Sequence, residues 1–197
     1  MFMKRLLDIF SSAWVLLLLL PFWLLIALAI VLESRGGVFY RQVRVGKDNK
    51  DFQLYKFRTM RTGSDQKGLL TVGERDSRIT RVGYFLRKYK IDEFPQLLNV
   101  LKGDMSIVGP RPEVRKYVDM YTPEQMRVLS VRPGLTDIAS IQYVHENELL
   151  AASDDPEKTY IEEVMPAKLE LNLQYIDNQS VLGDIKLIWK TFTAILH

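Results

Sequence analysis

An adjacent acidic pair, Asp92 and Glu93, is the strongest candidate for chemistry in this chain of 197 residues. The sequence has no cysteine, which excludes a thiolate nucleophile, a thiolate zinc site and an iron–sulfur cluster. Its two histidines, His145 and His197, give poor support to a histidine metal site or a Ser/His triad. We therefore expect the nucleophile or proton acceptor to be a carboxylate.

The residues that follow the acidic pair predict the helix that positions it. Apolar side chains recur at the spacing of one buried helical face, at Phe94, Leu97, Leu98 and Leu101. Pro95 suits the first turn of this helix, and Gly103 suits its C-terminal cap. The pattern therefore places Asp92 and Glu93 at the helix N-terminus. Two interpretations stay open: a cap with favourable charge–dipole contact, or carboxylates that act on a substrate.

Basic side chains near this helix in the sequence predict a site for an anion. Residues 38–45 and 51–60 alternate like the two strands of a β-hairpin, whose polar positions carry Arg41, Arg44, Lys56 and Arg58. Five more cations follow, at Arg78, Arg81, Arg87, Lys88 and Lys90. Arg111 lies in a Pro-Arg-Pro turn, and flanking prolines hold an arginine in the fixed geometry that suits phosphate recognition. A solvated strand edge and plain turn chemistry are the alternatives.

A long apolar segment near the N-terminus predicts attachment to a membrane. Residues 13–32 carry no charge, and the helix extended back to Ile9 is about 36 Å long, against roughly 30 Å of bilayer hydrocarbon. A cleaved signal peptide is disfavoured, because the apolar core is too long and residues 33–35 do not resemble a cleavage site. A single span and a re-entrant helix, which enters and leaves by one face, remain.

Two features favour the re-entrant helix. Pro21, near the middle of the apolar segment, removes a backbone hydrogen bond and predicts a kink. Cations flank both ends of the segment, at Lys4, Arg5, Arg35, Arg41, Arg44 and Lys47. The positive-inside rule then draws both ends to the cytoplasm. We expect residues 1–35 to form a re-entrant membrane helix and residues 36–197 to form a cytoplasmic catalytic domain.

The remaining patterns predict a mostly helical α+β fold, with one small β-hairpin and several amphipathic helices. The polar stretch from Gly63 to Asp76 predicts a mobile loop. Ser180 can cap a last helix over residues 181–196, one side of which carries Ile185, Ile188, Trp189, Phe192 and Leu196. We expect this apolar side to pack in the core, with contact to the membrane interface as the alternative. A membrane tether, a net charge of only +3 and the lack of a recognisable nucleic-acid-binding motif favour phosphate on a small molecule or lipid as partner, and no nucleic acid.

Six ordered motifs together with the membrane segment resemble the bacterial sugar transferase family, the monotopic phosphoglycosyl transferases. From Lys4 to Thr136 they read KRLLDI, YRQVRVG, FQLYKFRTM, DSRITRVGYFLRK, IDEFPQLLNVLKGDMSIVGPRP and VRPGLT. The chain departs from the family pattern after Thr136, where Asp137 and Ser140 replace the glycine and glutamine of many relatives. Nucleotide or sugar contacts are therefore not carried over to residues 137–146.

The resemblance implies an enzyme that moves a phosphosugar from a UDP-sugar to a polyprenol phosphate, expected to be undecaprenyl phosphate, with Mg²⁺. It implies a place at the cytoplasmic face of the bacterial inner membrane, at the first membrane step of a surface glycan. By the same resemblance, Asp92 is the nucleophile of a covalent phosphosugar intermediate, and Glu93 with Asp92 binds Mg²⁺. Lys56, Arg87 and Arg111 are then the phosphate-binding residues, and Pro21 breaks the membrane helix.

Two other functions are weighed against this one. A membrane-anchored scaffold would hold anions or lipid head groups with the basic hairpin, and its acidic pair would only cap a helix. A polytopic transferase is disfavoured because the sequence has one long apolar segment. The motifs carry no signal for the sugar or for the oligomeric state.

Overall fold

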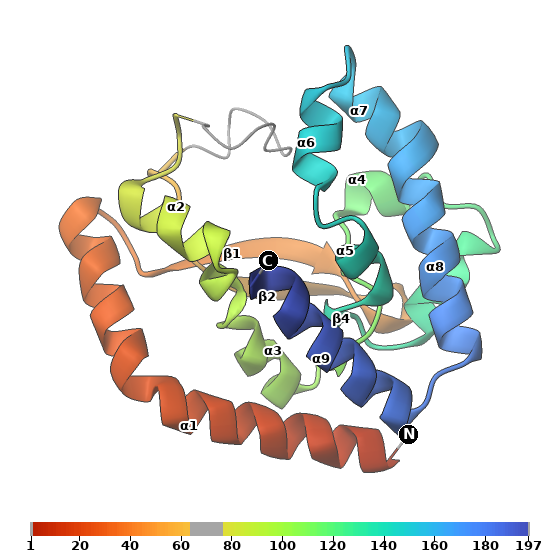
Figure 1. Cartoon of the computed structure of the whole chain (residues 1–197), viewed down its shortest axis with the longest axis horizontal. Coiled ribbons are helices and arrows are strands. Elements are labelled where there is room, and N and C mark those ends of the chain that lie inside the picture. The colour runs from red at the N-terminus through yellow and green to blue at the C-terminus, as the bar shows by residue number, and fades with distance from the viewer. Residues whose placement is uncertain (1, 64–76, 197) are drawn as a thin grey trace.

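The computed structural model describes residues 2–63 and 77–196, which form a mostly helical α+β fold (Figure 1). The predicted loop between Gly63 and Asp76 lies, beyond its first residue, outside the described residues. The longer helices are α1 (Phe2–Glu33), α2 (Arg81–Lys88), α3 (Gln96–Lys102), α8 (Met165–Asp177) and α9 (Val181–Leu196). The shorter ones are α4 (Arg115–Val118), α5 (Ile138–Gln142), α6 (Glu146–Ala151) and α7 (Pro156–Thr159).

The predicted hairpin is confirmed as strands β1 (Phe39–Val45) and β2 (Asp51–Phe57). The strands are antiparallel, with Phe39 opposite Phe57 and Tyr40 opposite Lys56. Leu54 and Phe57 are both buried, but they are three residues apart and therefore lie on opposite faces of β2, in different hydrophobic clusters. Lys56 lies on the face of the strand opposite Phe57, the face that also carries Leu54, and there it can serve the site.

A second sheet pairs two short strands that the sequence patterns did not predict. Strands β3 (Ser106–Val108) and β4 (Gly134–Thr136) run parallel, with Val108 opposite Thr136. The backbones beyond β3 approach so closely that a Cβ added at Gly134 would lie 2.2 Å from the amide nitrogen of Gly109. Glycine is therefore required there. This close pairing holds the start of the Pro-Arg-Pro turn.

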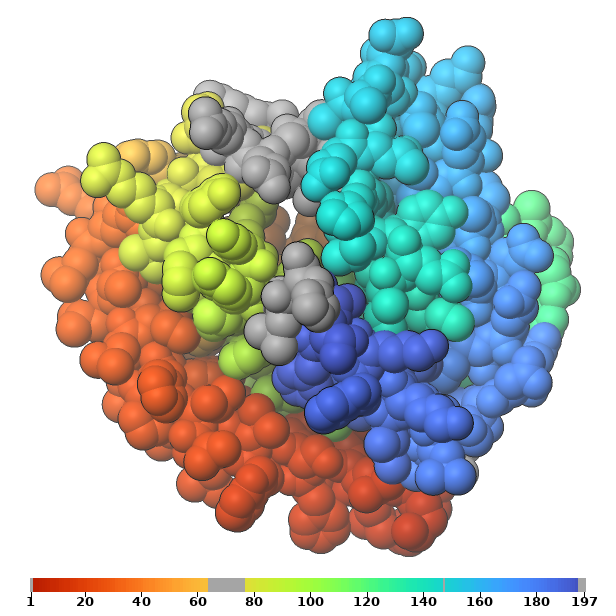
Figure 2. All heavy atoms as spheres, viewed as in Figure 1, coloured from red at the N-terminus to blue at the C-terminus, as the bar shows by residue number. Residues whose placement is uncertain are grey.

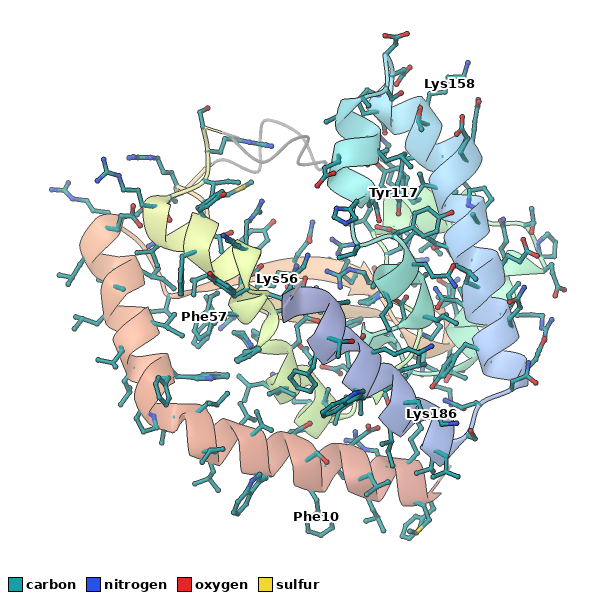
Figure 3. All side chains as sticks on the ribbon, in the orientation of Figure 1. Phe10, Lys56, Phe57, Tyr117, Lys158 and Lys186 are labelled. Atoms are coloured by element: carbon teal, nitrogen blue, oxygen red, sulfur yellow. The ribbon has the colours of Figure 1, made fainter. Side chains whose placement is uncertain are left out.

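Helix α1 is the one helix among residues 2–63 and 77–196 that is long and apolar enough to cross a membrane, with a mean hydropathy of 3.1 in its most apolar window. It contains Pro21, and Figure 1 shows it bent near its middle, as the sequence predicts. Its second arm packs Trp23, Ile26 and Ile30 against Phe57 and Leu86. Figure 3 shows Phe10 pointing away from the rest of the molecule. One side of the bent helix therefore holds the domain, and the other side is apolar and exposed.

The largest hydrophobic core lies between α8 and the segments that surround α4, and it contains Tyr117, Val128 and Leu169. The apolar side of α9, which we expected to pack in the core, is largely exposed. Trp189 is 72% exposed and Phe192 is 60% exposed. The core-packing prediction for this side of α9 is wrong, because a stripe of apolar residues has the same spacing whether it faces a core or lipid.

Candidate active site

The acidic pair lies in a 3₁₀ turn of residues Ile91–Glu93, between α2 and α3. Lys90, in the left-handed conformation with φ 55°, reverses the chain at the end of α2 and starts this turn. Asp92 and Glu93 are buried, with 6% and 8% of their surfaces exposed. Neither caps α3, because the residue at that cap is Pro95 and no side chain bonds there. Neither side chain therefore serves as the capping group of α3.

Glu93 is clamped between two cations from different parts of the fold. Lys56 of β2 donates from Nζ to Oε1 of Glu93 over 2.9 Å. Arg111 donates to both carboxylate oxygens, over 3.2 Å from Nη1 to Oε2 and from Nη2 to Oε1. Burial alone would raise the pKa of Glu93, but the charges of Arg111 and Lys56 hold it well below the usual range. Glu93 is therefore ionised, and its carboxylate holds Lys56 and Arg111 in place.

Asp92 has a different environment from its neighbour. No hydrogen bond to its carboxylate comes from residues 2–63 or 77–196. Burial raises the pKa of Asp92, and the charge of Glu93 adds to this effect, while Lys56, Arg87 and Lys90 oppose it. The two adjacent carboxylates thus differ in pKa direction and in partners. Asp92 is a desolvated carboxylate beside several cations, and no described residue bonds its oxygens, which is the arrangement expected of a nucleophile for a phosphorus centre.

Arg87 is held near Asp92 by a residue that the sequence analysis missed. Its Nε donates to Oγ1 of Thr59, which follows β2, over 2.9 Å. At the same point a Cβ on Gly83 of α2 would lie 2.0 Å from the backbone oxygen of Thr59. This close approach fixes α2 against the end of the hairpin. A buried threonine after a basic strand gives no sequence signal of that role.

The site segment, residues 81–102, is held at both ends by α1. Oε1 and Oε2 of Glu33 accept from the backbone nitrogens of Arg81 and Val82 over 2.7 and 2.8 Å, which caps the start of α2. At the other end, Arg5 donates over 2.7 Å to the backbone oxygen of Val100 and over 3.2 Å to that of Leu101 in the last turn of α3. The two ends of α1 thus position the segment that carries Arg87, Asp92 and Glu93.

The other predicted cations of the hairpin do not reach the acidic pair. Arg44 bonds Gln42 and Glu113, and Arg41 lies over the ring of Tyr55. Arg58 caps the end of α1 through the backbone oxygens of Ser34, Arg35 and Gly37. Of the candidate phosphate ligands, the structure therefore brings Lys56, Arg87 and Arg111 to the acidic pair. Lys56 is labelled in the central part of Figure 3, and Figure 2 shows the same face hollowed between α2 and helices α5 and α6.

The acidic pair fits Mg²⁺ in part. Within the described ranges, no group of three or more histidine and acidic side chains could hold a metal ion. Mg²⁺ is commonly held by one or two carboxylates together with substrate phosphate oxygens, so two carboxylates suffice. No residue in the described part of the chain bonds the oxygens of Asp92, whereas Lys56 and Arg111 bond those of Glu93. Asp92 is thus the more available ligand. Glu93 would bind a metal only after Lys56 or Arg111 released its carboxylate and bonded a substrate phosphate instead.

Comparison with known proteins gives consistent matches over the whole chain. A family model described as bacterial sugar transferase matches residues 1–197. The chain is 42% identical over 198 residues to the UDP-N-acetylgalactosamine-undecaprenyl-phosphate N-acetylgalactosaminephosphotransferase of Aeromonas hydrophila, with 99% of the chain and 44% of that relative covered. It is 38% identical over 196 residues to the UDP-glucose:undecaprenyl-phosphate glucose-1-phosphate transferase of Caulobacter vibrioides, with 98% of the chain and 69% of the relative covered. It is 40% identical over 201 residues to the exopolysaccharide production protein PSS of Rhizobium leguminosarum bv. phaseoli, with 98% and 95% covered.

Proposed function

The chain belongs to the bacterial sugar transferase family, and from this membership and the geometry of Asp92 and Glu93 we propose that it transfers a sugar-1-phosphate from a UDP-sugar to undecaprenyl phosphate. The names of its relatives support both substrates and a place in exopolysaccharide synthesis. The observation that carries the proposal is the contrast between the two carboxylates. Glu93 is neutralised by two cations, whereas Asp92 is buried, accepts no hydrogen bond from the described residues and lies close to the same cations.

The proposed reaction has two displacements at one phosphorus atom. A carboxylate oxygen of Asp92 attacks the sugar-linked phosphorus of the UDP-sugar, and the bond from this phosphorus to the bridging oxygen breaks. UMP leaves with that oxygen, and an aspartyl phosphosugar remains. An oxygen of undecaprenyl phosphate then attacks the same phosphorus and displaces Asp92. The products are undecaprenyl diphosphate sugar and the free carboxylate, so the enzyme is regenerated.

The cations around the pair reduce the repulsion between a carboxylate and a diphosphate. Lys56, Arg87 and Arg111 lie where their charges can stabilise the transferring phosphoryl group and the departing UMP. When bound, Mg²⁺ would add charge neutralisation of the diphosphate, with Asp92 and Glu93 as its protein ligands. Glu93 keeps Lys56 and Arg111 in place until the substrate phosphates compete for them.

For the membrane topology, we propose that α1 is re-entrant and that the domain lies at the cytoplasmic face of the inner membrane. The first arm of α1 bonds the domain through Arg5 and through Asp8, which accepts from Oγ of Ser106 and the backbone nitrogen of Ile107. The second arm bonds it through Glu33 and through the carbonyls that Arg58 caps. A spanning helix would carry one of these sets to the opposite side of the bilayer. The exposed apolar side of α9 supports contact of the same domain with the interface.

This topology predicts that both ends of α1 are protected from the outside of the cell. Single cysteines placed by Met3→Cys and Arg35→Cys in the otherwise cysteine-free protein should both resist a membrane-impermeant thiol reagent in intact cells. Both should react after permeabilisation, because the two positions lie on the cytoplasmic side. Labelling of Met3→Cys alone in intact cells would establish a simple span and contradict the proposal.

The function is tested by incubating the purified protein with Mg²⁺, undecaprenyl phosphate and a panel of UDP-sugars. Release of UMP together with a lipid-linked diphosphate sugar is expected for at least one sugar. A scaffold that only binds anions would retain the nucleotide and release no UMP from any of them. The sugar that gives the fastest release also identifies the substrate.

A further inference from the structure

Asp137 accepts a backbone hydrogen bond that only one residue of the Pro-Arg-Pro turn can donate. Pro110 and Pro112 have no backbone N–H, so the amide of Arg111 is the single backbone donor of this turn. That amide donates to Oδ2 of Asp137 over 3.0 Å. Asp137 is 1% exposed and follows directly after β4. The side chain of Arg111 extends to Glu93 and bonds its carboxylate.

Asp137 also bonds two other elements. Its Oδ1 accepts from the backbone nitrogen of Ser140 over 2.6 Å, which caps α5, and its Oδ2 accepts from Nδ2 of Asn172 in α8 over 3.2 Å. The oxygen of the same amide, Oδ1 of Asn172, is buried and has no hydrogen-bond partner among residues 2–63 and 77–196. The side-chain amide of Asn172 is therefore oriented to donate to Asp137. Three donors from three segments converge on one buried carboxylate, which offsets the cost of burying its charge.

The contact continues the pairing of β3 with β4 by one residue. The backbone nitrogen of Gly109 donates to the oxygen of Thr136 over 3.0 Å, and that of Gly134 donates to the oxygen of Pro110 over 2.9 Å. The next amide along the turn, that of Arg111, bonds the side chain of Asp137 and not a backbone oxygen. The Asp137 side chain takes the place of the next backbone acceptor and fixes the position from which Arg111 reaches the acidic pair.

We propose that Asp137 is a positioning residue for Arg111. It holds the backbone of Arg111 so that the guanidinium meets Glu93 before the reaction and the substrate phosphates during it. This inference rests on the proposed function for its effect on turnover, but the contact itself can be measured separately. A side chain that acts only by stabilising the fold would reduce activity equally whether or not Arg111 is present.

The test is a double-mutant cycle with the substitutions Asp137→Ala and Arg111→Ala, read as kcat/KM for UMP release. We expect Asp137→Ala to lower kcat/KM by roughly 10-fold to 100-fold in the wild-type background and by less than about 3-fold in the Arg111→Ala background, because the two residues act as one unit. Equal losses in the two backgrounds, or no loss in the first, would overturn the proposal. Asp155→Ala is the matched control, since Asp155 caps α7 in the same way and lies outside the site. It should leave kcat/KM unchanged.

Hydrogen exchange separates this inference from the proposed function. In Asp137→Asn, which keeps the shape and has one acceptor oxygen in place of two, the Arg111 amide should exchange faster than in wild type within the peptide that contains residues 109–113. Unchanged exchange overturns the positioning role, whatever the activity. If exchange rises but wild-type protein releases no UMP from any UDP-sugar, the contact stands and the proposed function fails.

Discussion

Asp92→Asn should abolish turnover and leave the fold intact. The substitution keeps the size and shape of the side chain but removes the anionic oxygen that, in the proposed reaction, attacks phosphorus. We expect the rate of UMP release to fall by at least about 1,000-fold, equivalent to about 4 kcal/mol in the activation free energy. The loss should persist at saturating UDP-sugar, because the missing group acts in the chemical step and not in uniform binding.

Stability gives this prediction a second readout. The pKa of Asp92 is raised by burial, so ionisation of Asp92 at neutral pH opposes folding, and a neutral asparagine should keep or raise the melting temperature. Glu93→Gln should also lose most activity, but this substitution should lower the melting temperature. The pKa of Glu93 is lowered, so its charge stabilises the fold above the pKa of the unfolded chain, and this contribution is lost on acidification. A large drop in melting temperature for Asp92→Asn would indicate a structural carboxylate and contradict the assignment.

Lys56→Met and Arg87→Ala should each reduce turnover by roughly 10-fold to 1,000-fold, because in the proposed reaction each cation stabilises phosphoryl charge by about 1.4 to 4 kcal/mol. Lys56→Met keeps much of the buried aliphatic stem and leaves Glu93 paired with Arg111. The protein should therefore stay folded and membrane-bound. The measurement is the initial rate of UMP release at saturating UDP-sugar.

Lys50→Met supplies a matched control for Lys56→Met. Lys50 is exposed in the turn that joins β1 to β2, and its loss removes one positive charge from the same hairpin without touching the acidic pair. It should turn over at the wild-type rate. Rates near wild type for both Lys56→Met and Arg87→Ala would assign these cations to a solvated basic face and not to phosphate binding.

Those parts of the fold whose signals are local could be predicted from the sequence. Alternation of residue types marked the hairpin, and Gly103 marked the end of α3, where it adopts the left-handed conformation with φ 96°. Pro21 marked the bend of α1. Each of these features depends on a few neighbouring residues and their intrinsic geometry.

Features that depend on contacts between distant segments could not be predicted. Strands β3 and β4 have three residues each, too few for a periodic signal, and pair across more than twenty residues of sequence. The clamp on Glu93 joins a strand, a turn and a loop. Asp137 stood out only as a departure from a motif, because its role exists only once the Arg111 amide lies beside it.

The covalent intermediate at Asp92 is the central claim, and it is tested most directly by mass spectrometry of wild-type protein mixed with its UDP-sugar and Mg²⁺ in the absence of undecaprenyl phosphate. We predict release of up to about one UMP per active site and a mass increase of one phosphosugar on the peptide that contains Asp92. Subsequent addition of undecaprenyl phosphate should remove the added mass. If no adduct forms and UMP appears only when the lipid acceptor is present, the phosphosugar passes directly between substrates, and the role of Asp92 as nucleophile is contradicted.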